Sequence, residues 1–387
     1  MKELLYLYIL SVFIITITGC KKPYNPNIPA VQSNYLVVEG VINSGQDSTI
    51  INLSRTVTLS APVKTTSEFG AQVVVESDQN TVYTLQDMGN GKYASPSLNL
   101  DNTRTYHLRI KTLSGKEYLS DFEAVKTNPP IDSVGFTEQN NGIQLYVNTH
   151  DPNNDTRYYR WDYTEAWNFH AKYESEFFSD GTQLNPRSPA QQVYTCFGND
   201  VSSTINLASS AKLVKDIIYQ SPLTTIASTS EKLETKYSIL VKQYALTNEE
   251  YNFWQNLKKN TEQLGSIFDA QPSELQGNIH CVTDPSEPVL GYIGVTNIQQ
   301  KRIFISKNQL PDTWLVNYPY QCELDTFLFN RNNLNEVAEF LIPLNSSDLP
   351  VTAIYSKGGA IVGYTGSDRE CSDCTIRGAD QPPPFWR

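Results

Sequence analysis

The fold is decided by residues 106–111 (YHLRIK), in which apolar and polar side chains alternate strictly. Successive side chains of an extended strand point to opposite faces, so this run predicts a β-strand with Tyr106, Leu108 and Ile110 on its buried face. His107 is then expected on the solvent side. The run therefore predicts a sheet that is packed on one face.

The sequence before and after this run repeats the pattern in short segments. Strands are predicted at residues 35–42, 48–53, 71–76 and 81–85, separated by turns rich in Gly and Asn. Such spacing predicts an Ig-like or transthyretin-like β-sandwich over residues 34–127. The two prolines of Asn128-Pro129-Pro130 stop the ladder and mark the end of this domain.

Strand patterns continue beyond residue 130 over a longer stretch. Tyr159, Trp161 and Tyr163 fall on one face of a strand predicted at 157–167. Further strands are predicted at 131–136, 143–149, 203–207, 237–245, 289–296 and 301–306. Together these runs predict a larger β-rich domain, fibronectin-III-like in architecture, over residues 128–387.

One amphipathic helix is predicted within this domain, at residues 248–264. Thr247 and Glu250 have the spacing of a capping box, in which the hydroxyl accepts from a free amide and the carboxylate reaches back to the cap. Tyr251 and Trp254 then follow near helical spacing, and we expect this aromatic stripe to pack on the sheet. The predicted fold class is mainly β with one inserted helix.

Composition restricts the partners. The formal net charge is −11, and a phosphate backbone repels such a surface, so we expect no nucleic acid partner. The chain has 23 Tyr, and aromatic enrichment favours half-buried β surfaces. Because Tyr also offers contact area at low entropic cost, a binding surface stays open as a second explanation.

The amino end predicts export and lipid anchoring. Residues 4–17 are almost uninterruptedly apolar, which fits a signal peptide, whereas a spanning helix needs about 20 apolar residues. Ile17-Thr18-Gly19-Cys20 follows and has the form of a lipobox, so we expect residues 1–19 to be removed and Cys20 to be lipidated. Two acyl chains anchor stably. We expect a tether at residues 20–33 and attachment to the outer membrane, on a face left open.

Five cysteines remain besides the lipidation site. Disulfides are permitted outside the inner membrane, and one or two bridges are expected. Five residues cannot all pair, and the connectivity cannot be read from the sequence. The candidates are Cys196, Cys281, Cys322, Cys371 and Cys374.

No stretch of the sequence carries a motif that identifies a catalytic activity. The sequence lacks the HExxH, G-x-S-x-G, P-loop and dinucleotide-binding glycine patterns. Its four histidines, His107, His150, His170 and His280, stand apart in the sequence. We therefore assign no catalytic residue, no metal ligand and no cofactor.

Two spacings resemble those of ion sites. Cys371-Ser372-Asp373-Cys374 can present two thiolates to zinc, with His280-Cys281 as a distant second pair, but a disulfide role is favoured in an oxidising compartment. Asp151, Asn153 and Asp155 have the alternate spacing of a calcium loop. Because Thr156 replaces the required glycine, an acidic turn is favoured there.

Several blocks of the chain resemble DUF4249, a family of Bacteroidota lipoproteins. The terminal signature is matched by residues 371–378 (CSDCTIRG) and the closing Pro384-Phe385-Trp386. The central blocks are matched by 158–161 (YYRW), 253–260 (FWQNLKKN), 277–281 (GNIHC) and 289–292 (VLGY). On physical grounds we expect Cys371, Cys374 and the aromatic tail to fasten the C-terminus onto the second domain, because a bridge restricts the unfolded chain and Phe385 and Trp386 bury apolar surface.

The family has no defined catalytic residues, so the resemblance carries none over. Its members are typically encoded beside TonB-dependent outer-membrane transporters, which implies an accessory role. We therefore predict an outer-membrane-anchored, non-enzymatic lipoprotein that partners such a transporter and captures its ligand. Two alternatives stay open: a surface or periplasmic hydrolase with its site in the aromatic-rich second domain, and an adhesive or structural surface protein.

Overall fold

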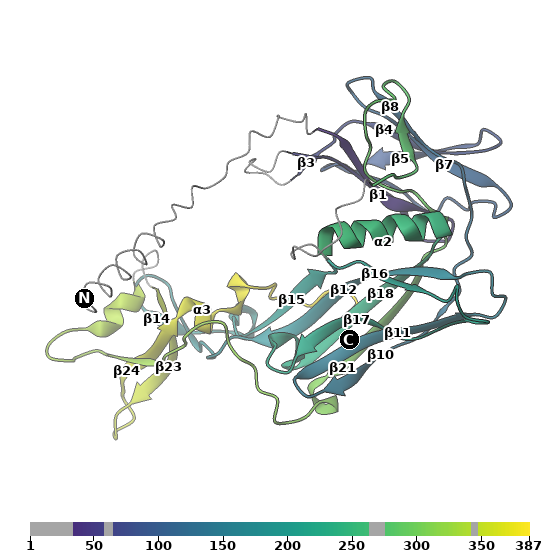
Figure 1. Ribbon diagram of the computed structural model, residues 1–387. Coiled ribbons are helices and arrows are strands. Elements are labelled where there is room, and N and C mark those ends of the chain that lie inside the picture. The colour runs from purple at the N-terminus through teal and green to yellow at the C-terminus, as the bar shows by residue number, and fades with distance from the viewer. Residues whose placement is uncertain (1–33, 58–64, 263–274, 342–346) are drawn as a thin grey trace, which may run out of the picture.

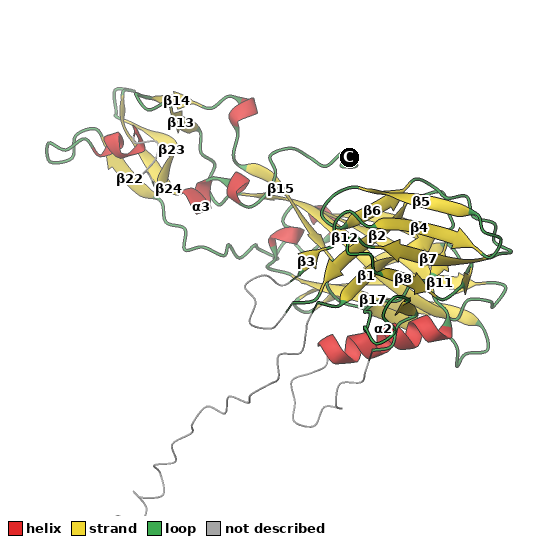
Figure 2. Ribbon diagram, turned by 90° about the horizontal axis from the view of Figure 1, so that it is seen from above, coloured by secondary structure: helices red, strands yellow, loops and turns green. Residues whose placement is uncertain are grey.

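The computed structural model describes residues 34–57, 65–262, 275–341 and 347–387. The predicted signal peptide, the lipidation site Cys20 and the tether lie outside the described residues. Within these ranges the chain is mainly β, with curled sheets that form sandwich-like units and one long inserted helix, as predicted. Figure 1 shows two β-rich units and a smaller projecting module, and Figure 2 shows from above how this module stands apart from the rest.

The first unit is a strongly curled sheet around its own core. Its strands follow the order β19-β8-β7-β4-β5-β6-β2-β1-β20, and all neighbours are antiparallel except β1 and β20. Tyr106, Leu108 and Ile110 on β7 point into the core, as the alternation predicts. The bounds are β1 Leu36–Asn43, β2 Thr49–Arg55, β3 Thr66–Ser67, β4 Gln72–Ser77, β5 Val82–Asp87, β6 Lys92–Ser95, β7 Thr105–Lys111, β8 Glu117–Ser120 and β9 Glu123–Ala124.

The placement predicted for His107 is wrong. The alternation puts this ring in solvent, but it is only 7% exposed. Strand β9 pairs with β7 and brings Phe122 over this face, where the two rings stack with centroids 4.1 Å apart. The Nε2 atom lies 2.9 Å from the carboxylate of Glu76 on β4. Residues distant in sequence therefore cover a face that the local pattern assigns to solvent.

A segment from far along the chain completes the first unit. Strand β19, Ile279–Cys281, pairs with β8, and β20, Val295–Thr296, pairs with β1. Ile293, between them, belongs to the first core. The sequence assigns this segment to the second domain and predicts one strand at 289–296. In the structure the segment is part of the first unit, and only its last two residues in that range form a strand.

The second unit is a sandwich of two sheets. One has the order β10-β11-β17 and the other β15-β12-β18-β21, with β16 beside β12. Tyr159, Trp161 and Tyr163 share the buried face of β12, as predicted. The bounds are β10 Ile131–Gln139, β11 Gly142–Asp151, β12 Tyr158–His170, β15 Thr195–Val201, β16 Asn206–Ser209, β17 Asp216–Ala227, β18 Lys236–Ala245 and β21 Gln299–Ser306.

A buried amide network joins the two units. The Gln243 side chain accepts from Trp161 Nε1 at 2.9 Å and donates to Asn128 Oδ1 at 3.0 Å and to the Pro129 carbonyl at 2.7 Å. The Asn128 backbone amide donates in turn to Asn297 Oδ1 at 2.7 Å. The chain passes from one unit to the other near residue 128 and again near residue 297, and these hydrogen bonds join the two crossing points. They also satisfy the buried amides, which need hydrogen-bond partners.

The long helix α2, Asn248–Glu262, lies across β12 and β16, between the two units in Figure 1. The Glu250 amide donates to Thr247 Oγ1 at 3.1 Å, which is the predicted cap. The Glu250 carboxylate does not take its predicted place. It lies against Gly294 and accepts from Trp254 Nε1 at 3.4 Å, because the helix presents this position to the first unit.

The projecting module combines two distant segments of the chain. Its small core contains Phe340 and Tyr364, with Phe177 packed against them. Its strands are β13 Phe177–Ser179, β14 Leu184–Pro186, β22 Asp325–Leu328, β23 Asp348–Tyr355 and β24 Ile361–Asp368. The short helical segments of the chain are η1 Pro189–Gln191, η2 Glu231–Leu233, η3 Lys307–Gln309, η4 Glu336–Leu341, α3 Arg369–Ser372 and η5 Cys374–Ile376.

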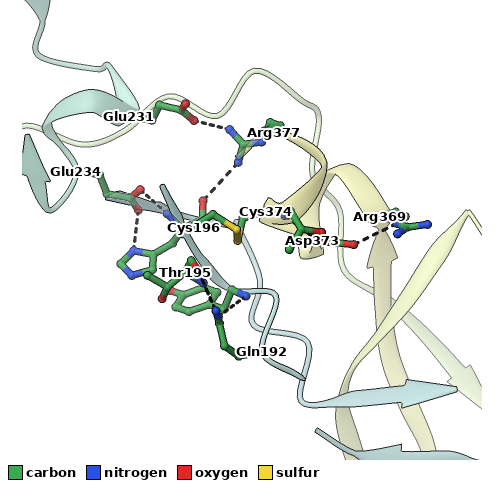
Figure 3. The surroundings of a disulfide bond; sticks show 12 residues. Gln192, Thr195, Cys196, Glu231, Glu234, Arg369, Asp373, Cys374 and Arg377 are labelled. Carbon is green, nitrogen blue, oxygen red and sulfur yellow. Dashed lines mark hydrogen bonds and ion pairs between the residues drawn. A yellow bond between two sulfur atoms is a disulfide. The ribbon is translucent and has the colours of Figure 1, made fainter. Parts of the chain in front are cut away.

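Two disulfides fasten the end of the chain. Cys196 on β15 bonds to Cys374, and Cys322 bonds to Cys371, whereas Cys281 is buried and free. Figure 3 shows the first bridge beside Arg377, which pairs with the carboxylate of Glu231. The adjacent cysteines of the terminal run thus hold two different parts of the structure, β15 and the segment that leads to β22.

The aromatic tail lies on the outer face of the second unit. Trp386 packs edge-on against Phe197 and Phe304, with centroids 5.3 and 5.8 Å apart. Phe385 lies 3.5 Å from the guanidinium carbon of Arg302 and stays 36% exposed. The tail therefore covers the sheet partly through cation–π contact rather than by full burial. None of the helices in the described ranges has the length and apolarity needed to cross a bilayer.

Candidate functional site

A groove lies where the two units meet. Its walls come from β1 and β2 of the first unit, from β12 and β18 of the second, and from α2. Its volume is about 880 Å³. Ligand sites typically have volumes of about 300–1,000 Å³ and often lie between domains. The groove therefore has the size and the position of a binding site.

Arg160 makes several contacts in the groove wall. The guanidinium carbon lies 4.3 Å from the ring centroid of Tyr244 and 4.2 Å from that of Trp254. Nη1 donates to Asp162 at 3.1 Å, while the buried Nε has no partner among the described residues. Two cation–π contacts and an ion pair therefore hold the guanidinium in place before a ligand binds.

The lining of the groove is mainly negative. Asp162 pairs with Arg160, and Glu262 pairs with Lys258 at 3.5 Å. Glu39 on β1 is exposed and has no ion pair among the described residues. A surface with an excess of one sign attracts the opposite charge, so the groove favours a cationic ligand. The charged lining residues are Glu39, Asp47, Asp162 and Glu262 against Arg160 and Lys242.

An apolar pocket lies beside the groove, against α2. Its volume is about 180 Å³, and Phe253, Leu290 and Tyr292 are among its walls. Four residues line both cavities, so the two are neighbours: Glu39, Gly40, Trp254 and Leu257. The pocket is smaller than the site of a whole small molecule and suits one leucine- or phenylalanine-sized group.

Buried acids lie behind this wall. Burial raises the pKa of Glu250 to about 7, although the charge of Arg160 and the hydrogen bond from Trp254 oppose the change. Burial also raises the pKa of Glu123, which accepts from the Tyr292 hydroxyl at 2.8 Å. The contact between α2 and the first unit therefore contains a carboxylate that titrates near neutral pH.

The four histidines lie in separate places, and none lines the groove or its pocket. Each has a carboxylate partner of its own: His107 with Glu76, His150 with Asp132, His170 with Glu234 and His280 with Asp121. In the part of the chain that the structure describes, no group of three His, Cys, Asp or Glu is arranged to hold a metal ion.

The two spacings that resemble ion sites form structural features. Cys371 and Cys374 sit in separate disulfides, so neither offers a free thiolate to zinc or to a dithiol redox cycle. The Asp151 carboxylate accepts from three backbone amides of the following turn at 2.8–2.9 Å. Burial raises the pKa of Asp151, but these bonds outweigh it and hold the pKa below its ordinary value. This is an acidic turn.

Sequence reasoning missed the groove. Its lining comes from separated stretches, at residues 39–52, 160–162, 201–205, 242–262 and 298–300. The available signals were the aromatic density of 157–167 and the stripe on the helix. The stripe does pack toward the sheet, but Trp254 does so through Arg160 and also faces the groove.

The fold and the groove define a class: a mainly β chain of sandwich-like units with a cavity between them. The chain belongs to the DUF4249 family, described as a domain of unknown function, whose sequence model matches residues 21–302. This range includes the whole groove and the blocks at 158–161 and 253–260. The terminal run 371–378 and the closing aromatic residues lie beyond it.

Comparison with curated proteins gives no match. Among solved structures, the chain is similar to the crystal structure of a Salmonella alpha-2-macroglobulin mutant, with a TM-score of 0.17 and 9% sequence identity. The alignment covers 86% of this chain but only 16% of that one.

Proposed function

We propose that this chain is a lipoprotein anchored to the outer membrane, which captures a ligand in its groove for a TonB-dependent transporter and catalyses no reaction itself. The observation that carries the proposal is the groove itself, a cavity of about 880 Å³ walled by both units. Its Arg160 is held in place before any ligand binds, which lowers the entropic cost of binding.

The anchor and the tether fit this role. Two acyl chains on Cys20 would hold the chain at the membrane, and a Pro-rich segment at residues 20–33 would act as a spacer. Tethering raises the effective concentration of the groove near a transporter in the same membrane. A groove with low affinity for its ligand can then still deliver that ligand to the transporter.

The test is affinity purification of the full chain from native membranes in mild detergent. A TonB-dependent barrel is expected to co-purify with the wild type. Cys20→Ser should release the chain from the membrane fraction and lower the recovery of the barrel. Cys281→Ser, at the buried free cysteine, is the matched control and should leave both unchanged. Recovery of the wild-type chain without any barrel would contradict the proposal.

A further inference from the structure

The β-ladder at the edge of the first unit has a gap beside the groove. On this side of β1, Val38 N donates to the Leu290 carbonyl at 2.8 Å and Ile42 N donates to the Gly294 carbonyl at 3.0 Å. The rung between them would join Gly40 to Tyr292. Among the described residues, no hydrogen bond joins those two main chains.

Asn278 holds the main chain opposite the gap. Its side chain takes both main-chain groups of Ile293, accepting from N at 2.9 Å and donating Nδ2 to O at 3.0 Å. The segment is bonded to β1 at Leu290 and again at Gly294, but not between them. The even-numbered main-chain groups of β1 face this side, because Glu39 and the other odd positions face β2. Gly40 thus directs an N–H and a C=O toward the gap.

The apolar pocket and the groove meet at the same place. Gly40 and Leu257 line both cavities, and Phe253 on α2 is a further wall of the pocket. An extended peptide alternates its side chains about its main chain. A main chain lying along Gly40 would direct one side chain into the pocket and its neighbours toward the groove.

Charge selects among such peptides. The carboxylates of Glu39 and Asp47 are exposed on the first-unit wall. Among the described residues that line the groove, Lys242 and Arg160 are the only cations, and Arg160 is already paired with Asp162. An acidic neighbour residue would meet repulsion at the first-unit wall, and a basic one would meet attraction.

We propose that the groove and its pocket bind an extended peptide segment, with one leucine-sized apolar side chain in the pocket, its main chain on Gly40, and basic residues beside Glu39 and Asp47. This ligand class rests on the ligand-capture role proposed above. The recognition mode is main-chain bonding at the single unpaired position of β1, between the filled rungs at Val38 and Ile42, combined with a pocket that gives selectivity.

The test is calorimetric titration of the purified full chain with acetyl-Gly-Lys-Leu-Lys-Gly-amide. This peptide should bind at least tenfold more tightly than the same peptide with Ser for Leu or with Glu for both Lys. Methylation of the Leu amide nitrogen removes the donor for Gly40 and should cost at least tenfold as well. Equal affinity for all four peptides, or displacement of the first by decanoate at a similar concentration, would overturn the proposal.

Substitutions in the protein provide a test that is independent of the changes to the peptide. Leu257→Trp fills the pocket and should abolish binding, whereas Leu315→Trp, at a position 75% exposed outside the groove, should not change it. Circular dichroism confirms that each variant is folded, and unchanged affinity of folded Leu257→Trp would also overturn the proposal. No transporter takes part in these titrations. Peptide binding without a co-purified barrel would therefore contradict the transporter partnership and leave the peptide-binding proposal in place.

Discussion

Replacing Glu250 with Gln should stabilise the chain, and more strongly at high pH. The carboxylate is 3% exposed, and burial raises its pKa from 4.5 to about 7. The folded chain therefore binds this proton more tightly than the unfolded chain. The contribution of Glu250 to stability is greatest below pH 4.5 and falls as the pH rises through 7.

The magnitude follows from the two pKa values. Keeping the carboxylate charged and buried at pH 8.5 costs about 3 kcal/mol relative to the protonated form. At pH 5 most of the folded chain carries the proton already, and the cost is about 1 kcal/mol. Gln has the same shape, carries no charge and can still accept from Trp254 Nε1. Glu250→Gln should therefore raise the free energy of unfolding by about 3 kcal/mol at pH 8.5 and about 1 kcal/mol at pH 5.

The assay is urea unfolding of the purified wild type and variant, followed by tryptophan fluorescence at both pH values. Glu249→Gln is the matched control, because it removes a carboxylate from the exposed face of the same helical turn. The control should change stability by less than about 1 kcal/mol. A gain for Glu250→Gln that does not grow with pH, or a loss of stability at pH 8.5, would refute the argument.

Three further predictions concern the buried amide network, one disulfide and the projecting module. Gln243→Leu should destabilise by about 3 kcal/mol in urea unfolding, because it leaves the Trp161 indole N–H buried without an acceptor; a change under about 1 kcal/mol would show that water replaces the amide. Cys196→Ser opens a bridge with a sequence separation of 178 and should cost about 3–5 kcal/mol, with earlier proteolytic release of the C-terminal segment; identical cleavage would contradict this. Burial and the adjacent Asp368 raise the pKa of Asp348 to about 6, so the projecting module should be more stable at pH 5 than at pH 7.5. Asp368→Asn should reduce that difference in hydrogen exchange of β23 and β24, while the part due to burial remains.

Local periodicity predicted the elements well where one face of a strand meets a core. Tyr106, Leu108 and Ile110 on β7 lie where the alternation puts them, as does the aromatic face of β12. The same rule wrongly placed His107 in solvent. An alternating pattern shows which face of a strand is apolar, but it does not show whether another segment covers the polar face. Phe122, which covers the other face, arrives through the pairing of β9 with β7. Such pairing depends on the path of the chain and leaves no mark on residues 106–111.

The packing partner of one segment could not be predicted for a related reason. The residues around Ile293 follow strands of the second unit along the chain, but Ile293 packs in the core of the first unit. Nothing in a short apolar run states which core it joins, since hydrophobic burial is non-directional. The groove could not be predicted from the sequence either, because it forms only where these distant stretches come together.

The amide network around Gln243 determines what kind of groove results from this arrangement. Two chain crossings, near Asn128 and Asn297, are bonded to each other and to the second unit, so neither crossing acts as a free hinge. The groove walls therefore keep their spacing without a ligand, and binding does not have to order the units. Glu250 on α2 accepts from Trp254 and also faces the charge of Arg160, and burial raises its pKa to about 7. Loss of its proton near neutral pH therefore changes the charge beside two side chains of the groove wall.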